Sequence, residues 1–507
     1  MTLRQLALLA AAALLPAAAL GAQARPLVIT NALVYDGSGG PAVRGGVRVV
    51  AGRITAVGAV VPARGDSVVD AQGLALAPGF IDAHSHHDGD LDRLPDALGA
   101  VSQGITTIIV GQDGGSNYPL AGWFRQLEQA PAAINVASYV GHGTVRDLVL
   151  RGDFRRHATA EEVGRMKVLV RQEMAAGALG LSSGLEYDPG IFSDRTEVLA
   201  LAQAAADQGG RYISHIRSED RFFWDAIDEI VAIGRVTRMP VQISHVKLAM
   251  RPLWGRADSL LALLNAARAQ GVNVTADIYP YPYWHSTLTV LFPARDYTDR
   301  REAELAVTEI STPAGIRLGK YLPNPEFAGK TLAEIAPMLG MDSVSALIEL
   351  IRRAEQLKAE GYDDVESVIA TSMMEPDIEK LIAWPYTAFC TDGALDGAHP
   401  RGFGSYPRFL GRYVRERHVL SLAEAVRRAS ALAADNAGIT GRGRLAAGQA
   451  GDLVLFDPAT ILDNATPAEP HATSTGIRAV WVNGALVYDG VKPTGARPGQ
   501  VIRRGVP

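Results

Sequence analysis

Four histidines of this chain stand at the ends of apolar segments, in a spacing that suits metal binding. His84 and His86 form an HxH pair directly after Phe80-Ile-Asp-Ala, and alternate residues of an extended strand point to the same side. His215 and His245 each follow the dipeptide Ile-Ser at the end of another apolar segment. Because neutral imidazole is a common metal ligand, the pattern predicts that the four side chains meet around a metal. Separate burial of all four is the alternative.

Two further residues at segment ends could take part in proton transfer. Asp392 closes the apolar segment of residues 386–392, and a carboxylate there could accept a proton from an activated water and also bind the metal. A purely local role in the Asp-Gly turn is the alternative for Asp392. His142 ends the segment of residues 134–142 and could polarise the scissile carbonyl or bind the leaving portion of a substrate. A structural role for His142 is equally open.

The composition excludes several classes of site and partner. Lys and Arg number 49 against 54 Asp and Glu, which gives a formal net charge of −5. Since no dense basic stripe occurs either, a nucleic acid partner is not expected. The single cysteine, Cys390, excludes an intrachain disulfide and a multi-cysteine zinc site. A metal in this protein must therefore be held by histidines and carboxylates.

The segments that carry these residues alternate with amphipathic ones in a regular order. Apolar runs such as residues 105–111 and 211–216 are each followed by a stretch with the spacing of a helix of about 12 residues. This order predicts an α/β fold, a TIM-like (β/α)8 barrel over residues 79–435, in which catalytic groups collect at the carboxyl ends of the strands. A proline-rich stretch interrupts the alternation, and we expect an insertion near residues 286–343 before the last strand.

Two similar phrases stand near opposite ends of the chain. Residues 31–37 read NALVYDG and residues 483–490 read NGALVYDG, each alternating apolar and polar residues before an Asp-Gly turn. We therefore predict one small β-sandwich built from residues 25–78 and 436–507. Two independent terminal hairpins are the alternative, although isolated hairpins have little stability of their own.

The first 24 residues have the composition of a secretory signal peptide. Arg4 supplies a positive charge, residues 6–15 form an apolar stretch, and small residues at positions 19–24 offer cleavage sites. We expect a periplasmic or secreted protein with no membrane segment after cleavage. Retention of the segment as a membrane anchor is the alternative.

Several phrases resemble those of a known family. APGFIDAHSHHD, GITTIIVG, GALGLSSGLEYDPG, ADIYPY and HPRGFGSYPRFLGRYVRE occur in this chain. They are similar to motifs of the N-acyl-D-amino-acid deacylases, or D-aminoacylases, of the amidohydrolase superfamily. The resemblance implies a zinc-containing barrel flanked by a small β-sandwich, which hydrolyses the amide bond of N-acyl-D-amino acids to a carboxylate and a free D-amino acid.

The resemblance also assigns roles to individual residues. It implies that His84 and His86 form one metal-binding pair, that His215 and His245 form the other, and that Asp392 is the general base and acid. It further implies that three residues bind the substrate carboxylate: Lys247, Arg401 and Tyr187. Such a trio is chemically reasonable, since it offers charge-assisted donors to an anion.

The sequence departs from the family pattern at two acidic residues. Asp113 stands where the family has a zinc-binding cysteine, and Glu186 stands where the family typically has an apolar residue. Two zinc ions close together repel one another and need an anionic bridge. We therefore predict that Glu186 bridges two zinc ions, of which the first is also bound by Asp392. Direct metal binding by Asp113 and a surface ion pair for Glu186 are the alternatives.

Together these features predict a zinc-dependent deacylase in which a metal-bridged hydroxide attacks the amide and Asp392 carries the proton to the leaving amine. The partner would be a small N-acyl-D-amino acid or a related amide. A dipeptidase for D-residue-containing or isoaspartyl dipeptides is a close alternative. A secreted metal-binding or ligand-binding protein without catalysis is another, and the presence of Asp392 beside two histidine pairs argues against it.

Overall fold

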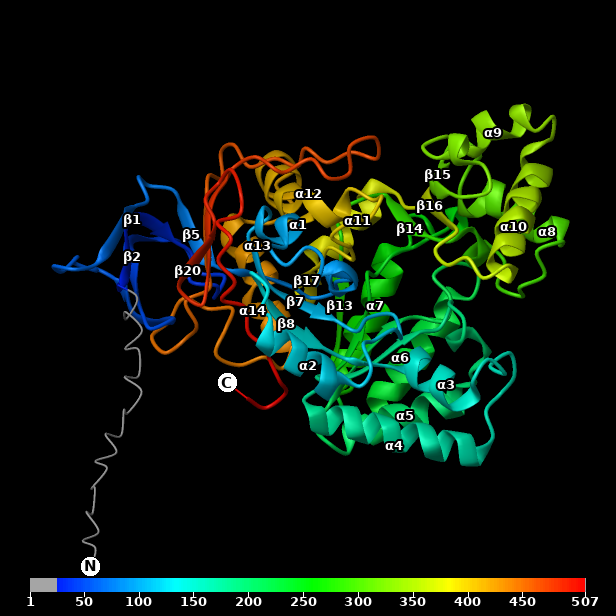
Figure 1. The fold of residues 1–507 in the computed structure, drawn as a ribbon, viewed down its shortest axis with the longest axis horizontal. Coiled ribbons are helices and arrows are strands. Elements are labelled where there is room, and N and C mark those ends of the chain that lie inside the picture. The colour runs from blue at the N-terminus through cyan, green and yellow to red at the C-terminus, as the bar shows by residue number, and fades with distance from the viewer. Residues whose placement is uncertain (1–24, 507) are drawn as a thin grey trace, which may run out of the picture.

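The computed structural model describes residues 25–506, so the predicted signal peptide of residues 1–24 lies outside the described part of the chain. Figure 1 shows three parts: a sheet formed by both ends of the described chain, a central barrel, and a lobe inserted late in the barrel. In this view the terminal sheet lies on the left of the barrel and the lobe at the upper right.

Within residues 25–506, eight parallel strands form the barrel if β8 and β9 are taken as one strand broken at Tyr139. Strands β6, β7 and β8 pair in that order, and β9 to β13 continue to β17 in one ladder. The circle closes through backbone hydrogen bonds of 2.9 Å from Asp392 N to His84 O and from His86 N to Gly393 O. The predicted TIM-like barrel is confirmed. The strands are β6 Phe80–Asp82, β7 Ile105–Val110, β8 Asn135–Ser138, β9 Val140–Gly141, β10 Gly180–Gly184, β11 Arg211–His215, β12 Val241–Ile243, β13 Val274–Ile278 and β17 Thr387–Phe389.

Helices cover the outside of the barrel, which explains why strands such as β7 are buried at every residue. Helix α4 shows how the sequence sets their bounds, since Thr159 and Glu162 form a capping box at its start and Gly177 ends it with φ +111°. No helix among residues 25–506 has both the length and the hydropathy required to cross a membrane. The helices of the barrel part are α1 Leu98–Val101, α2 Leu120–Gln129, α3 His142–Leu150, α4 Ala160–Ala176, α5 Arg195–Ala206, α6 Phe223–Thr237, α7 Ala257–Ala269, α11 Glu375–Ala383, α12 Arg401–Arg408, α13 Leu422–Ala429 and α14 Ala431–Ala437.

Both ends of the described chain enter one eight-stranded sheet. Its order is β20-β19-β18-β5-β1-β2-β3, with β4 paired to β1. Strand β18 of the C-terminal part pairs antiparallel with β5 of the N-terminal part, so the two ends form one unit with its own apolar core rather than two independent hairpins. The strands are β1 Leu27–Val34, β2 Val43–Val50, β3 Arg53–Gly58, β4 Ser67–Asp70, β5 Ala75–Pro78, β18 Leu453–Phe456, β19 Ile477–Val482 and β20 Ala485–Tyr488.

The lobe lies between β13 and β17 of the barrel in the chain. A three-stranded antiparallel sheet in the order β14-β16-β15 forms its base. This sheet gives the lobe a span of about residues 283–371, wider than the proline-rich stretch that marked it in the sequence. Its elements are β14 Tyr283–Ser286, the short turns η4 Leu288–Leu291 and η5 Ala306–Ile310, β15 Ile316–Tyr321, β16 Glu366–Thr371, and the helices α8 Arg300–Leu305, α9 Leu332–Met338 and α10 Ser343–Ala359.

Candidate metal centre and active site

Each of the four histidines lies at the carboxyl end of a barrel strand. His84 and His86 follow β6, His215 is the last residue of β11, and His245 lies two residues beyond β12. Because the strands are parallel, their carboxyl ends open on one rim of the barrel. The ring centroid of His84 lies 5.3 Å from that of His86 and 4.9 Å from that of His245. The centroid of His215 lies 4.8 Å from that of His245, so the four imidazoles form one group.

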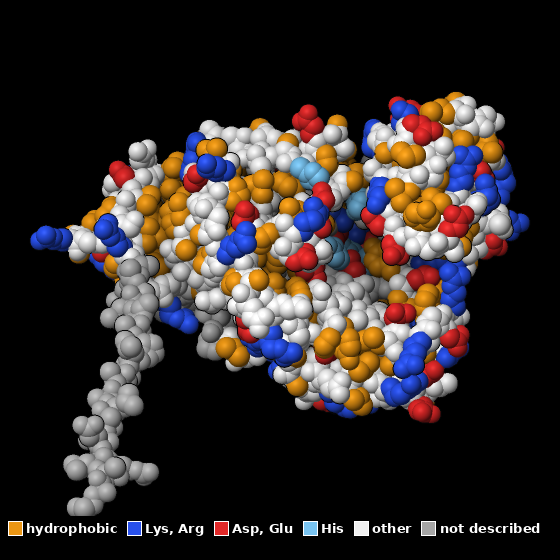
Figure 2. Space-filling view, viewed as in Figure 1, with side chains coloured by type: hydrophobic (Ala, Val, Ile, Leu, Met, Phe, Trp, Pro, Cys, Tyr) orange, Lys and Arg blue, Asp and Glu red, His pale blue; other side chains and the backbone are white. Residues whose placement is uncertain are grey.

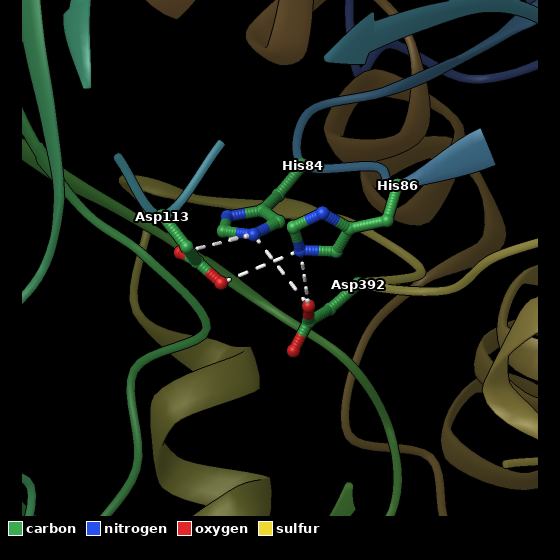
Figure 3. A group of neighbouring side chains, drawn as sticks. All are labelled: His84, His86, Asp113 and Asp392. Carbon is green, nitrogen blue, oxygen red and sulfur yellow. Dashed lines mark ion pairs between the residues drawn. The ribbon is translucent and has the colours of Figure 1, made fainter. Parts of the chain in front are cut away.

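Two carboxylates join His84 and His86 in a first cluster, drawn in Figure 3. Nε2 of His84 lies 3.4 Å from Oδ1 of Asp113 and 3.5 Å from Oδ1 of Asp392. Nε2 of His86 lies 3.3 Å from Oδ2 of Asp113 and 3.3 Å from Oδ1 of Asp392. Asp113 comes from the loop after β7 and Asp392 from the loop after β17, so three separate strand ends build this cluster.

Asp113 also belongs to a second cluster, which it forms with His215 and His245. Its Oδ1 lies 3.4 Å from Nε2 of His245, and Nδ1 of His215 lies 3.1 Å from that same nitrogen. Asp113 is therefore the carboxylate that the two clusters share.

The donor atoms of the first cluster fit a metal ion better than a hydrogen-bond network. Both ring nitrogens of His84 and Oδ1 of Asp113 are buried without a hydrogen-bond partner among residues 25–506, which is an unfavourable state for polar atoms. Ligand atoms at the usual zinc distances lie about 3.3–3.4 Å apart when they surround the ion tetrahedrally. The separations of 3.3–3.5 Å in the cluster match this spacing.

The backbone is strained at the two carboxylates of the first cluster. Asp113 has φ +52° and Asp392 has φ +49°, both in the left-handed region, which aspartate adopts more readily than most residues. Gly114, next to Asp113, has no room for a side chain, since a Cβ there would lie 2.8 Å from the backbone N of Gly184. Such strain is typical of functional sites, because the surrounding fold must hold it in place.

Glu186 lies beside His215 and outside the first cluster. Its Oε2 accepts a hydrogen bond from Nε2 of His215 at 3.0 Å, and its Oε1 accepts one from the backbone N of Glu219 at 2.6 Å. Both carboxylate oxygens of Glu186 are therefore hydrogen-bonded, and Glu186 contacts the ring nitrogen of His215 that does not contact His245. This geometry does not support the prediction that Glu186 bridges two metals. Glu186 belongs to a third group of possible metal ligands, with His215 and Glu219, whereas Asp113 is the residue common to the first two clusters.

Glu219 was not singled out from the sequence, yet it is central to the site. Its Oε1 lies 3.0 Å from Nδ1 of His245, and Nζ of Lys247 lies 2.7 Å and 2.8 Å from its two oxygens. Burial alone would lower the pKa of Lys247, but the charge of Glu219 raises it, so the lysine is a cation at neutral pH. An acidic residue four positions after His215 is the signal that could have indicated Glu219.

Asp392 is held by an arginine on the oxygen that faces away from the histidines. Nη1 of Arg401 donates to Oδ2 of Asp392 at 2.6 Å, and both residues are buried. Burial alone would raise the pKa of Asp392, but the positive charges of Arg401 and His245 hold it well below its usual range. The carboxylate is therefore ionised at neutral pH and can accept a proton.

Two cavities meet beside the clusters, in the hollow between the lobe and the barrel where histidine side chains are visible in Figure 2. The outer cavity, of about 660 Å³, reaches His86, Asp113 and the loop around Asn117. The inner cavity reaches Lys247 and the lobe residue Trp284. Four residues line both cavities: Tyr187, His285, Asp392 and Arg401. A molecule bound across the two would pass directly beside Asp392.

The inner cavity contains three buried polar side-chain atoms that have no hydrogen-bond partner among the described residues. These are Oη of Tyr279, Nε of Arg401 and Nε2 of His285. The guanidinium carbon of Arg401 lies 4.9 Å from the ring centroid of Tyr279, and Nζ of Lys247 lies 5.6 Å from it. The predicted trio of Lys247, Arg401 and Tyr187 is brought together here, and Tyr279, from the ADIYPY motif, adds a donor that the sequence did not reveal.

The chain matches known proteins over most of its length. A model of the amidohydrolase family matches residues 67–272 and 383–488. The N-acyl-D-glutamate deacylase and the D-aminoacylase of Alcaligenes xylosoxydans xylosoxydans are 37% and 35% identical to it, and each alignment covers 94% of this chain and 96% or 97% of the relative. The chain belongs to the N-acyl-D-amino-acid deacylase family of amidohydrolases. The resemblance inferred from its motifs is thus confirmed.

Solved structures of family members have the same fold as this deacylase family protein. The N-acyl-D-glutamate deacylase of Bordetella bronchiseptica, complexed with zinc and a phosphonate inhibitor, gives a TM-score of 0.84 at 36% identity and covers 94% of this chain and 99% of its own. A D-aminoacylase structure gives 0.83 at 32% identity, with the same coverage. A further D-aminoacylase structure is described as having a binuclear metal centre.

His142 of this deacylase family protein lies outside both cavities and both clusters. Its Nε2 lies 2.8 Å from Oε1 of Glu197, which also pairs with Arg146, and all three side chains are buried. His142 begins α3 and Glu197 lies on α5, so this contact joins two helices on the outside of the barrel. This contact supports the structural alternative for His142, which the variant His142→Gln would test.

Proposed function

We propose that this protein hydrolyses the amide bond of N-acyl-D-amino acids with zinc as its cofactor. The observation that carries the proposal is the carboxylate of Asp113, shared by two histidine clusters beside the ionised Asp392. Support also comes from the similar deacylases, one of which is complexed with zinc and with a mimic of the reaction's tetrahedral intermediate. Asp113 in place of Glu186 would be the carboxylate common to both metal positions.

Two sets of donors would hold the metal. The first set is His84, His86, Asp113 and Asp392, and the second is Asp113, His215 and His245. Zinc at these positions would polarise the substrate carbonyl and lower the pKa of water. Glu186 would hold the ring of His215 in orientation, because its Oε2 accepts a hydrogen bond from Nε2 of His215. Glu219 and Lys247 would do the same for His245, because both contact its Nδ1, at 3.0 Å and 2.7 Å.

Asp392 would be the general base and then the general acid. Its Oδ1 faces His84 and His86, while Oδ2 is held by Arg401. Oδ1, the oxygen that Arg401 does not hold, can take a proton from the attacking water and return it to the nitrogen of the departing amine. Arg401 keeps the carboxylate ionised and fixes its direction, so the same oxygen serves in both transfers.

The inner cavity would fix the α-carboxylate of the substrate. Nε of Arg401 and Oη of Tyr279 are buried donors without partners in the described chain, and an anion placed between them would satisfy both. Lys247 adds positive charge to the same cavity, and Tyr187 lines the passage to the outer cavity. A substrate anchored in this way would have its amide beside Asp392. Binding would then hold the reacting atoms in the orientation that the reaction requires.

The experiment is metal analysis combined with a substrate panel. The zinc-loaded protein is assayed for release of free amine from N-acetyl-D-leucine, N-acetyl-L-leucine and a dipeptide with a C-terminal D-leucine. Hydrolysis of N-acetyl-D-leucine in preference to the other two supports the proposal. Turnover of the dipeptide alone would indicate a dipeptidase, and zinc binding without any turnover would indicate a binding protein; either result contradicts the proposal.

We also propose that the protein is exported, because residues 1–24 have the charge and apolar pattern of a secretory signal. Fractionation of cells that express the full-length chain, with mass determination of the N-terminus, tests this. A periplasmic or secreted product cleaved after position 21 or 24 is expected. An uncleaved chain in the cytosol or the membrane would contradict export.

A further inference from the structure

One wall of the inner cavity is apolar and comes from the lobe. Trp284 of β14, Val290 and Leu291 of η4, and Ile310 of η5 line it. Nε1 of Trp284 already donates to Oγ of Ser372 at 2.7 Å, so the indole ring offers the cavity an apolar surface. Trp284, Leu291 and Ile310 are buried. These four side chains can cover an apolar substrate side chain, and the other lobe residues of the cavity, His285 and Ser286 of β14, are polar but uncharged at neutral pH.

The two cations of the inner cavity are already paired. Lys247 contacts both oxygens of Glu219 at 2.7 Å and 2.8 Å, and Arg401 donates to Asp392 at 2.6 Å. Nζ of Lys247 also contacts Nδ1 of His245 at 2.7 Å, so under the proposed function Nε of Arg401 is the cationic donor left for the α-carboxylate. No other lysine or arginine of the described chain lines this cavity. A second carboxylate, on the substrate side chain, would therefore find no free positive charge.

Two arginines in neighbouring segments, Arg295 and Arg221, do not line the inner cavity. Nε of Arg295 donates to Oδ1 of Asp188 at 2.9 Å, and its other donors bind backbone carbonyl oxygens. Arg221 pairs with Glu302 through Nη1, while its Nε and Nη2 are buried without a hydrogen-bond partner among the described residues. Neither arginine lines the inner cavity, so neither compensates for the missing charge.

The remaining charged residues of the inner cavity are acidic. Glu186 and Asp220 line it beside Glu219, and they would repel a substrate carboxylate placed against the lobe wall. Burial, together with the charge of Arg401, lowers the pKa of His285 to about 4, so its ring is neutral at pH 7. Burying an unpaired carboxylate in such surroundings is strongly unfavourable.

We propose that the inner cavity selects N-acyl-D-amino acids with apolar, uncharged side chains, such as leucine and methionine, and rejects those with glutamate or aspartate side chains. The proposal rests on the proposed deacylase function and adds its substrate class. Sequence identity does not distinguish these substrate classes. Relatives named for D-glutamate, for D-aspartate and for D-amino acids in general have nearly equal identity to this chain. The apolar wall and the paired cations are the features that favour an apolar substrate side chain.

The test compares kcat/KM of the zinc-loaded protein for four substrates: N-acetyl-D-leucine, N-acetyl-D-glutamine, N-acetyl-D-glutamate and N-acetyl-D-lysine. Glutamine has the shape of glutamate without its charge, so this pair isolates the charge. We expect the value for leucine to be at least about tenfold above that for glutamate, with glutamine between them. An equal or higher value for glutamate overturns the proposal, as does a preference for N-acetyl-D-lysine. If no N-acetyl-D-amino acid is hydrolysed, the proposed function is wrong as well, so the two failures are distinguishable.

A matched pair of variants tests the lobe wall directly. Val290 is half-buried, so a longer side chain can be placed there without filling the core. Val290→Arg should shift the ratio of kcat/KM between N-acetyl-D-glutamate and N-acetyl-D-leucine toward glutamate by at least about tenfold, because it supplies the missing charge. Val290→Met, of similar length but uncharged, should keep the preference for leucine. A folded Val290→Arg variant with an unchanged ratio would overturn the assignment of this wall to the side chain.

Discussion

Oδ1 of Asp113 lies 3.4 Å from Nε2 of His84, and both atoms are buried without a hydrogen-bond partner among the described residues. A hydrogen bond would be shorter and would satisfy both atoms, whereas two ligands of one tetrahedral metal ion lie at about this separation. The same oxygen is 3.4 Å from Nε2 of His245. This one carboxylate therefore links the histidines of β6 with the histidines of β11 and β12.

Replacement of Asp113 should change the metal content of the protein. Asp113→Ala removes the carboxylate common to both clusters, so we expect no more than one zinc ion per chain. Asp113→Cys should retain more zinc, because a thiolate is also a zinc ligand. Elemental analysis of the purified variants measures this, with Asp147→Asn, an exposed change on α3, as the control. Full zinc content in Asp113→Ala would exclude the shared position.

Replacement of Asp392 should abolish proton transfer while leaving zinc in the second cluster. We expect Asp392→Asn to lower kcat by about 10²–10⁴-fold, which is the usual contribution of a general base. Asp396→Asn, in the same loop but half exposed and paired with Arg93, is the control and should have nearly full activity. A zinc-containing Asp392→Asn variant with undiminished kcat would contradict the role of Asp392.

The carboxylates behind the second cluster should tune metal affinity. Glu186→Gln weakens the hydrogen bond that orients His215, and Glu219→Gln removes the negative charge beside His245, so we expect zinc affinity to fall by about 10–100-fold in each variant. Competition with a chelator measures this. Glu304→Gln, an exposed residue of α8, serves as the control. If Glu186→Gln instead removed the first-cluster metal as completely as Asp113→Ala does, the original prediction of a bridging Glu186 would be restored.

Replacement of His142 should affect stability and leave catalysis intact. His142→Gln weakens the buried network with Glu197 and Arg146, so we expect the free energy of unfolding to fall by about 1–3 kcal/mol. Denaturant unfolding measures this loss. The kcat of the zinc-loaded, folded variant should stay near that of the unmodified protein. A large fall in kcat at unchanged stability would assign His142 a catalytic role after all.

The stability of the metal-free protein should decrease as the pH rises. Burial alone would lower the pKa of His86, but hydrogen bonds and charge from Asp113 and Asp392 raise it from 6.5 to about 10. A group whose pKa is raised by folding stabilises the native state below its unfolded pKa and loses that contribution as the pH rises through its folded pKa. Thermal unfolding after chelation should therefore show a falling Tm from pH 6.5 to pH 10.

Two controls separate this effect from other titrations. Zinc requires neutral imidazole, so the zinc-loaded protein should not show the same decrease. The variant His86→Gln should show a shallower dependence in its metal-free form, because it lacks the titrating ring. A Tm of the metal-free protein that rises over this range would contradict the protonated state assigned to His86.

Part of the site could be predicted from the pattern of residues in the sequence. His84 and His86 could be placed on one side because alternate strand residues share a face, and His215, His245 and Asp392 could be placed near them because parallel strands end on one rim. The lobe was visible as a proline-rich interruption, but its strand β16 came from apolar residues beyond that stretch. Pairings such as Lys247 with Glu219, 28 positions apart, left no local signal.

The sequence alone determined which donor types this protein has and at which strand ends they stand, because the periodicity of strands and helices is a local property. Only the tertiary structure decided that Asp113, and not Glu186, meets both histidine clusters. Metal coordination requires donor atoms within a few ångströms of one another, and that distance depends on the left-handed turn at Asp113 and on the packing of loops from different strands. Such packing is set by contacts between distant segments, which no local pattern records.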